Sequence, residues 1–195
     1  MRLFILISLL TLLVNSQALS QKSQKVKPTV NDLKFLIGEW EITFDFYDTH
    51  HPEKGIWFTE EGTMKCEFDM FYNGKPRFIT CKGKVKSNSG RFKGREREFR
   101  ESIRYGNFVS GFERVGIYSN WPGTAEELLF YYPEDRKIDI KGQLRVREGL
   151  ERYEDVYQFN EDYTSFTRRN VANFPDMPVP LYNLTLTGTG KKIKS

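Results

Sequence analysis

The sequence has very few of the residues that catalytic and metal sites use most often. Its two histidines are adjacent, His50 and His51, and a following proline marks a turn there. No His, Cys and acidic residues have the spacing of a zinc site, and no histidine lies on an expected strand where a Ser-His-Asp or Cys-His set would need it. Segment 188–191, Gly-Thr-Gly-Lys, lacks the length and the helix of a phosphate-binding loop. We therefore expect no metal and no cofactor.

The chain also lacks a face dominated by one sign of charge. Thirty Lys and Arg residues stand against 26 Asp and Glu residues, and the two signs are interspersed along the chain. Nucleic-acid binders concentrate basic residues on one surface, so we expect no nucleic-acid partner. The last five residues, 191–195, contain three lysines and are expected to form a solvated basic tail.

Only one long apolar run is present, and it lies at the N-terminus. Arg2 precedes an apolar run over 3–14, and Ala18-Leu19-Ser20 resembles a signal-peptidase site. A membrane span needs roughly 20 apolar residues, which favours a cleaved signal peptide over an uncleaved anchor, the alternative. We predict a signal peptide over 1–20 with cleavage after Ser20, a flexible segment over 21–30, and a secreted or periplasmic protein with no membrane span after cleavage.

The two cysteines lie at equal distances in sequence on either side of a predicted turn. Asn73-Gly74 between alternating segments is a strong signal for a two-residue β-hairpin. In such a hairpin the numbers of facing residues add up to the total of 73 and 74, and Cys66 and Cys81 meet this condition. In an exported protein, facing cysteines predict a disulfide, with free buried thiols as the alternative.

Strand-like segments follow one another from Gly38 onward, with turn signals between them at regular spacing. No alternation of strands with helices suggests a parallel sheet, so we predict a single antiparallel up-and-down β-barrel of about 8–10 strands over 31–190. A short helical plug is expected just before it. The expected strands are 40–47, 56–72, 77–86, 91–104, 108–118, 126–132, 137–147, 151–159, 163–170 and 181–187.

One expected strand breaks the apolar alternation. Segment 92–104 has charged residues on both faces, whereas the strand that begins at Trp40 has apolar residues on one face only. We interpret 92–104 as an exposed edge strand protected from aggregation by its charges. The alternative is that it places polar groups inside a cavity. Segment 170–180 is an apolar, proline-rich loop that is a candidate lid or binding element.

The candidates for chemistry are carboxylates and aromatic rings. Glu113 faces inward if Val115 and Ile117 do, and Arg114 then faces outward. A carboxylate inside a barrel needs a cationic or hydroxyl partner and has a shifted pKa. Glu113 is therefore our candidate for orienting a ligand; the alternative is a structural ion pair with an arginine. The aromatic residues predicted to bind the ligand are Trp40, Trp57, Trp121, Tyr131, Tyr153 and Tyr157.

Opposite charges also recur on the last expected strands. Glu154 and Asp155 precede, on a neighbouring segment, the pair Arg168-Arg169. Antiparallel pairing would bring them together as exposed ion pairs, each worth well under about 1 kcal/mol.

The opening motif resembles a known superfamily. Residues 35–40, Phe-Leu-Ile-Gly-Glu-Trp, followed by a long strand meander, resemble the lipocalin-like (calycin) superfamily, and within it the DUF1579-like secreted domains of unknown function. The resemblance implies a barrel whose tryptophan is covered by an arginine from a late strand, here Arg168 or Arg169. Haem-binding barrels of this type use a late histidine, and this chain has none after His51.

We therefore predict an exported, monomeric or weakly dimeric barrel that binds a small apolar or amphipathic molecule in its interior without converting it. One alternative is a lipocalin-like enzyme, an isomerase, dehydratase or hydrolase that uses Glu113 and Tyr131 as an acid and base. Another is a protein-interaction module that uses the Trp121 turn and the 170–180 loop.

Overall fold

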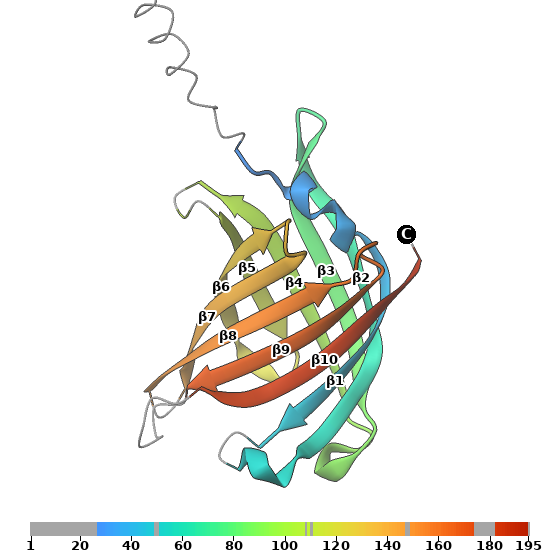
Figure 1. Ribbon diagram of the computed structural model, residues 1–195, viewed down its shortest axis with the longest axis vertical. Helices are drawn as coiled ribbons and strands as arrows, with labels where there is room; N and C mark the ends of the chain where they lie inside the picture. The colour runs from blue at the N-terminus through green and yellow to red at the C-terminus, as the bar shows by residue number, and fades with distance from the viewer. Residues whose placement is uncertain are drawn as a thin grey trace, which may run out of the picture.

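The computed structural model describes residues 27–48, 51–107, 109, 111–146, 149–173 and 182–194. Within these residues, ten strands form one closed antiparallel barrel, in which neighbours in sequence pair and the first strand pairs with the last (Figure 1). This confirms the predicted fold class. The strands are β1 (Gly38–Tyr47), β2 (Ile56–Tyr72), β3 (Lys75–Ser87), β4 (Glu96–Gly106), β5 (Gly111–Tyr118), β6 (Trp121–Tyr132), β7 (Lys137–Val146), β8 (Gly149–Phe159), β9 (Ser165–Asn173) and β10 (Asn183–Lys194).

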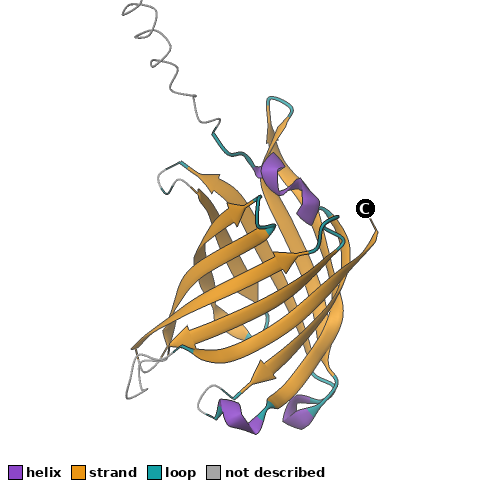
Figure 2. Ribbon diagram, in the orientation of Figure 1, coloured by secondary structure: helices purple, strands orange, loops and turns teal. Residues whose placement is uncertain are grey.

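Short 3-10 helices lie at both ends of the barrel (Figure 2). The first, η1 (Val30–Leu36), is the predicted plug, and η2 (Pro52–Lys54) and η3 (Gly90–Phe92) lie at the opposite end. None of the helices in the described ranges is long and apolar enough to cross a membrane. The predicted signal peptide and residues 21–26 lie outside the described residues.

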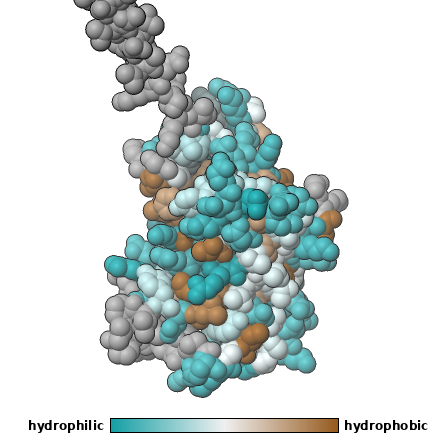
Figure 3. All heavy atoms as spheres, viewed as in Figure 1, coloured by the Kyte–Doolittle hydropathy of each residue, from teal (hydrophilic) through white to brown (hydrophobic). Residues whose placement is uncertain are grey.

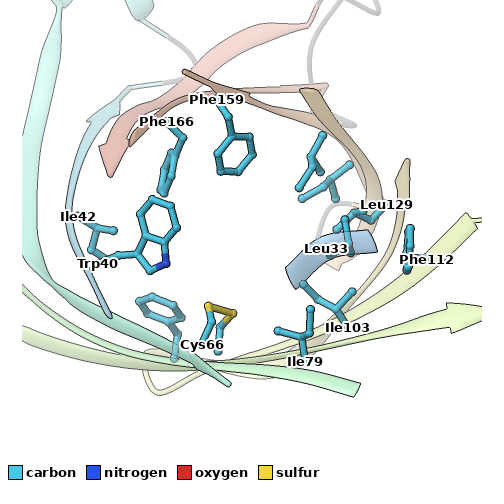
Figure 4. Close-up of a cluster of buried hydrophobic side chains, with 14 of the residues drawn as sticks. Leu33, Trp40, Ile42, Cys66, Ile79, Ile103, Phe112, Leu129, Phe159 and Phe166 are labelled. Carbon is cyan, nitrogen blue, oxygen red and sulfur yellow. A yellow bond between two sulfur atoms is a disulfide. The ribbon is translucent and has the colours of Figure 1, made fainter. Parts of the chain in front are cut away.

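The hairpin of β2 and β3 has the predicted register. Asn73 and Gly74 both have positive φ angles, 49° and 72°, as a two-residue turn of the twisted type requires. Cys66 therefore pairs with Cys81 across the strands, and the two form a disulfide with Cα atoms 4.0 Å apart. Both cysteines face the barrel interior (Figure 4).

Strand β4 corrects the edge-strand interpretation of 92–104. It pairs with β3 on one side and with β5 on the other, so the closed barrel gives it no free edge. Its inward face carries the buried Glu101 between Phe99 and Ile103. The charges on both faces of this segment thus reflect polar groups inside the barrel, which was the alternative interpretation.

The turn between β5 and β6 is shorter than the sequence suggested. Ser119 and Asn120 form it, and Trp121 is already the first residue of β6, paired with Tyr118. The expected turn around Trp121 is therefore wrong, because the strand continues through Pro122. The side chain of Trp121 lies outside what the structure describes, as do residues 174–180 of the expected 170–180 lid.

The plugged end of the barrel is an apolar core. From η1, the fully buried Leu33 points into the ring of side chains that Figure 4 shows across the interior. Trp40 at the start of β1 is also fully buried, and its indole N–H donates a 2.9 Å hydrogen bond to the Leu36 carbonyl oxygen. The ring of Phe35 lies 5.0 Å from that of Phe159. Helix and barrel are thereby joined by apolar burial and by a hydrogen bond that satisfies the indole.

The last residues correct two further expectations. Strand β10 continues to Lys194 and pairs with β1, so residues 191–194 are strand and not a solvated tail. The ammonium group of Lys192 lies 4.8 Å from the centre of the Trp40 ring and donates a 2.8 Å hydrogen bond to the carbonyl oxygen of Phe35. Lys192 therefore covers the tryptophan, the place expected for Arg168 or Arg169.

Candidate functional site

The barrel interior has two halves of different chemistry. The half next to η1 is filled by apolar side chains, whereas the half towards η2 and η3 contains ionised groups on inward-facing strand positions. We call the second the polar half. Its charged residues are Glu60, Arg97, Glu101, Arg114, Glu127, Glu151, Asp155 and Arg168.

Arg114 is at the centre of the polar half and is 3% exposed. Its Nη2 lies 2.9 Å from one oxygen of Glu127, while its Nε donates to the other. Its Nη1 donates to Glu101 at 3.2 Å. A fork of this geometry matches two carboxylates at once, which only arginine among the cationic side chains provides. Burial opposes ionisation of Glu127, but the Arg114 guanidinium outweighs it and holds the pKa of the Glu127 carboxyl below its ordinary value.

Two more ion pairs lie on either side of this centre. Arg168 donates to both oxygens of Asp155, with its Nη2 2.6 Å from Oδ2, and Asp155 is fully buried. Arg97 likewise donates hydrogen bonds to both carboxylate oxygens of Glu60, with its Nε 3.1 Å from Oε2. The sequence therefore predicted the pairing between β8 and β9 correctly through Asp155 and Arg168. The expectation that this pair is exposed is wrong, because Asp155 faces inward.

Tyrosine hydroxyls complete the network. Tyr153 donates a 2.6 Å hydrogen bond to Glu127, and Tyr118 donates to Glu101 at 3.3 Å. Burial raises the pKa of Tyr153, and the neighbouring Glu127 raises it further, so the phenol stays protonated as a donor. Gly142 makes room for this ring: a Cβ there would lie 2.2 Å from it.

A cavity of about 300 Å³ occupies the polar half. Its apolar wall includes Phe46 and Phe58, whose rings stack 4.5 Å apart, and its polar wall includes the ion pairs of Arg97 and Arg168. Glu151 also lines the cavity. Burial raises the pKa of Glu151 to about 7. The combination of aromatic rings with a few fixed polar groups is typical of sites for small organic molecules.

Glu113 does not face this cavity. Its strand presents Phe112 and Arg114 to the interior and leaves Val115 and Ile117 exposed, so the face expected from the sequence is reversed. Glu113 lies on the outer surface, where Arg104 donates to it at 2.6 Å. Glu113 thus forms an ion pair with an arginine, and Arg114 takes the inward position.

Of the predicted aromatic residues, Tyr153 lines the cavity, and Tyr157 lies beneath the Arg168 guanidinium at 5.1 Å. Trp57 is on the outer face of β2, 41% exposed, with the Arg91 guanidinium 4.4 Å from its ring. Trp40 belongs to the apolar half.

Tyr131 is the remaining predicted ring whose side chain the structure describes. It belongs to the plugged end, where its hydroxyl lies 2.8 Å from that of Tyr163. Because Tyr131 faces inward and Glu113 outward, the structure does not bring the proposed acid and base together.

Sequence reasoning missed most of the polar half. Arg114, Glu127 and Glu151 lie on strands whose inward face was assigned wrongly or not at all. A usable signal was present in β5, where the large rings of Phe112 and Tyr118 share a face with Arg114. In a small barrel large rings fill the interior, so they indicate the inward face better than β-branched residues, which also suit an exposed strand surface.

The interior has no arrangement that suggests a metal centre: among the described residues, no group of three or more His, Cys, Asp or Glu side chains is placed to hold an ion. Four of the five carboxylates of the polar half are engaged by arginines instead: Glu60, Glu101, Glu127 and Asp155. No protein-family model matches the chain, and no curated protein matches it either. The closed ten-strand barrel is compatible with a calycin-like fold.

Proposed function

We propose that the protein binds a small amphipathic molecule in the cavity of its polar half and does not convert it. The observation that carries this proposal is the hollow of about 300 Å³ in the polar half, with stacked rings on one wall and fixed ion pairs on another. A purely apolar ligand would displace water from the ionised wall, including Glu151, and offer no polar group in its place, which costs free energy. An amphipathic ligand satisfies both walls.

We also propose that the protein is exported to an oxidising compartment. The disulfide between Cys66 and Cys81 is consistent with an extracellular or periplasmic protein. Signal-peptide cleavage after Ser20 and a monomeric or weakly dimeric state remain predictions. The interaction-module alternative depends on Trp121 and the 170–180 loop; the side chain of Trp121 and residues 174–180 lie outside the described residues.

The test is native mass spectrometry of the mature protein, purified gently from its own host, with and without denaturing extraction. A bound molecule of defined mass at near-unit occupancy supports the proposal. The matched variants are Ala125→Phe, whose side chain enters the cavity, and Thr124→Phe, whose side chain is exposed one position earlier on β6. We expect the first to lose the bound molecule and the second to keep it, at equal thermal stability. An empty native protein, even after exposure to host lipid and metabolite extracts, would contradict the proposal.

A further inference from the structure

The positive and negative charges of the polar half are not equal in number. Three arginines face four carboxylates, and the geometry assigns each arginine fully. The arginines are Arg97, Arg114 and Arg168, and the carboxylates they hold are Glu60, Glu101, Glu127 and Asp155. These seven groups therefore carry a net charge of minus one before Glu151 is counted. A surplus charge in a low-dielectric interior raises the affinity for an ion of the opposite sign.

Glu151 is the carboxylate of the polar half that no cation among the described residues holds. It lines the cavity from β8, on the same face as Tyr153, and none of the described residues forms an ion pair or hydrogen bond with it. Burial alone raises its pKa to about 7, whereas Glu127, which is buried more deeply but held by Arg114, has a lowered pKa. The pKa values of the two carboxyl groups move in opposite directions because Arg114 holds Glu127, whereas no cation among the described residues holds Glu151.

We propose that the ligand carries a cationic nitrogen, an ammonium or amidinium group, that pairs with Glu151 while its apolar body packs against Phe46 and Phe58. This inference rests on the proposed function and names the ligand class for the same cavity. The aromatic wall suits such a ligand, because a cation or the carbon atoms beside it are attracted to the faces of aromatic rings.

An anionic ligand, such as a fatty acid, fits the same cavity less well. The guanidinium groups that line it, those of Arg97 and Arg168, are each bound by a carboxylate in a bidentate pair. An anion would have to replace one of these carboxylates and leave it buried without a partner, at a cost larger than the new pair returns.

Three probes of nearly equal size test the charge preference: 2-phenylethylammonium, 2-phenylethanol and 3-phenylpropanoate. Their dissociation constants are measured by isothermal titration calorimetry at pH 8 on the native protein and on Glu151→Gln. We expect the cation to bind native protein about tenfold more tightly than the alcohol, and this advantage to vanish in Glu151→Gln while the alcohol binds as before. The control is Glu154→Gln, on the outer face of β8, where the carboxylate pairs with Lys141; its affinities should match the native ones.

The outcomes separate this inference from the proposed function. Tightest binding by 3-phenylpropanoate, or an equal preference for the cation in native protein and in Glu151→Gln, overturns the cationic ligand. If all three probes bind equally and Ala125→Phe abolishes their binding, the cavity remains a binding site, and only the preference for a cationic ligand is rejected. If none of the probes binds and native mass spectrometry finds no ligand, both proposals fail.

Discussion

The two halves of the barrel interior are built from the same strands but serve different physical purposes. Along β5, Phe112 lies in the apolar half and Arg114, two residues later, lies in the polar half. Along β8, the same change occurs between Phe159 and Asp155. The boundary therefore crosses the strands instead of following them.

This division assigns stability to one half and the binding that we propose to the other. Apolar burial is worth roughly 25 cal/mol per Å² and requires no partner, so the plugged half can stabilise the whole barrel. Buried ion pairs bring little net stability, because desolvation offsets their attraction. The polar half can thus keep a hollow and ionised groups because the other half is filled.

The largest expected effect tests the apolar half. We expect Trp40→Ala to lower the free energy of unfolding by about 5 kcal/mol, since it removes a fully buried ring and its bond to Leu36. The matched control is Trp57→Ala on the outer face, with an expected loss of less than about 1 kcal/mol. Urea unfolding followed by tyrosine and tryptophan fluorescence measures both. Equal losses would show that the plugged end does not dominate stability.

The next effect tests the polar half. We expect Arg114→Met to destabilise the protein by about 4 kcal/mol at pH 7, because Glu101 and Glu127 remain buried without their cation. In the native protein the lowered pKa of Glu127 means that its pairing stabilises fully above the ordinary value of 4.5 and is lost as the pH falls through the lower folded value. Without Arg114 the carboxyl of Glu127 takes up its proton at a higher pH, so the difference in stability between native protein and variant should narrow between pH 7 and 4. A difference that stays constant with pH would contradict the assignment of charge to this cluster.

Removal of the disulfide should act on stability alone. We expect the double substitution Cys66→Ala and Cys81→Ala to cost about 3 kcal/mol, the loop-closure value for cysteines about 15 residues apart. Intact mass before and after reduction establishes the bond in the native protein, and thermal unfolding gives the loss. Because the disulfide belongs to the apolar half, probe binding at a temperature where the variant is folded should be unchanged; weakened binding would show that the halves are coupled.

The smallest expected effect is a gain in stability, from the substitution Glu151→Gln. The folded pKa of Glu151, about 7, lies above its ordinary value of 4.5, so native stability falls as the pH rises through this interval. Glu151→Gln removes this loss and should stabilise the protein at pH 8 by on the order of 1 kcal/mol, after allowance for solvent screening. At pH 4 the two proteins should be equal. Differential scanning calorimetry across this range tests it; stabilisation that is the same at both pH values would reject the titration of Glu151 as its cause.

The fold could be predicted from the sequence because its signals are local. Asn73 and Gly74 determine the turn, the turn determines the register, and the register brings Cys66 opposite Cys81. The apolar alternation that starts at Trp40 likewise indicates which face of β1 is buried. Each of these inferences needs only neighbouring residues and the two-residue period of a strand.

The site could not be predicted in the same way, because its residues meet only when the barrel closes. Arg114 and Asp155 come from strands that are not adjacent in the sheet, and the Nη2–Oδ2 distance of 4.0 Å between them is set by the barrel's diameter. A charged residue on a strand indicates an outward face unless an inward partner is known. The pattern around Glu113 and Arg114 gave no such partner, and the face was assigned from Val115 and Ile117.

The pairing of β1 with β10 has a consequence for the order of events in the life of the chain. Glu39 lies opposite Lys194, so the seam that closes the barrel joins the first strand to the last. The disulfide-bearing hairpin needs only local contacts and can form early, whereas the seam must wait for the final strand, and contacts of such long separation form slowly. The barrel therefore cannot close before β10 has been synthesised. The last contacts to form during folding should therefore be those that join β1 to β10, after both strands have left the ribosome or the channel that carries the unfolded chain.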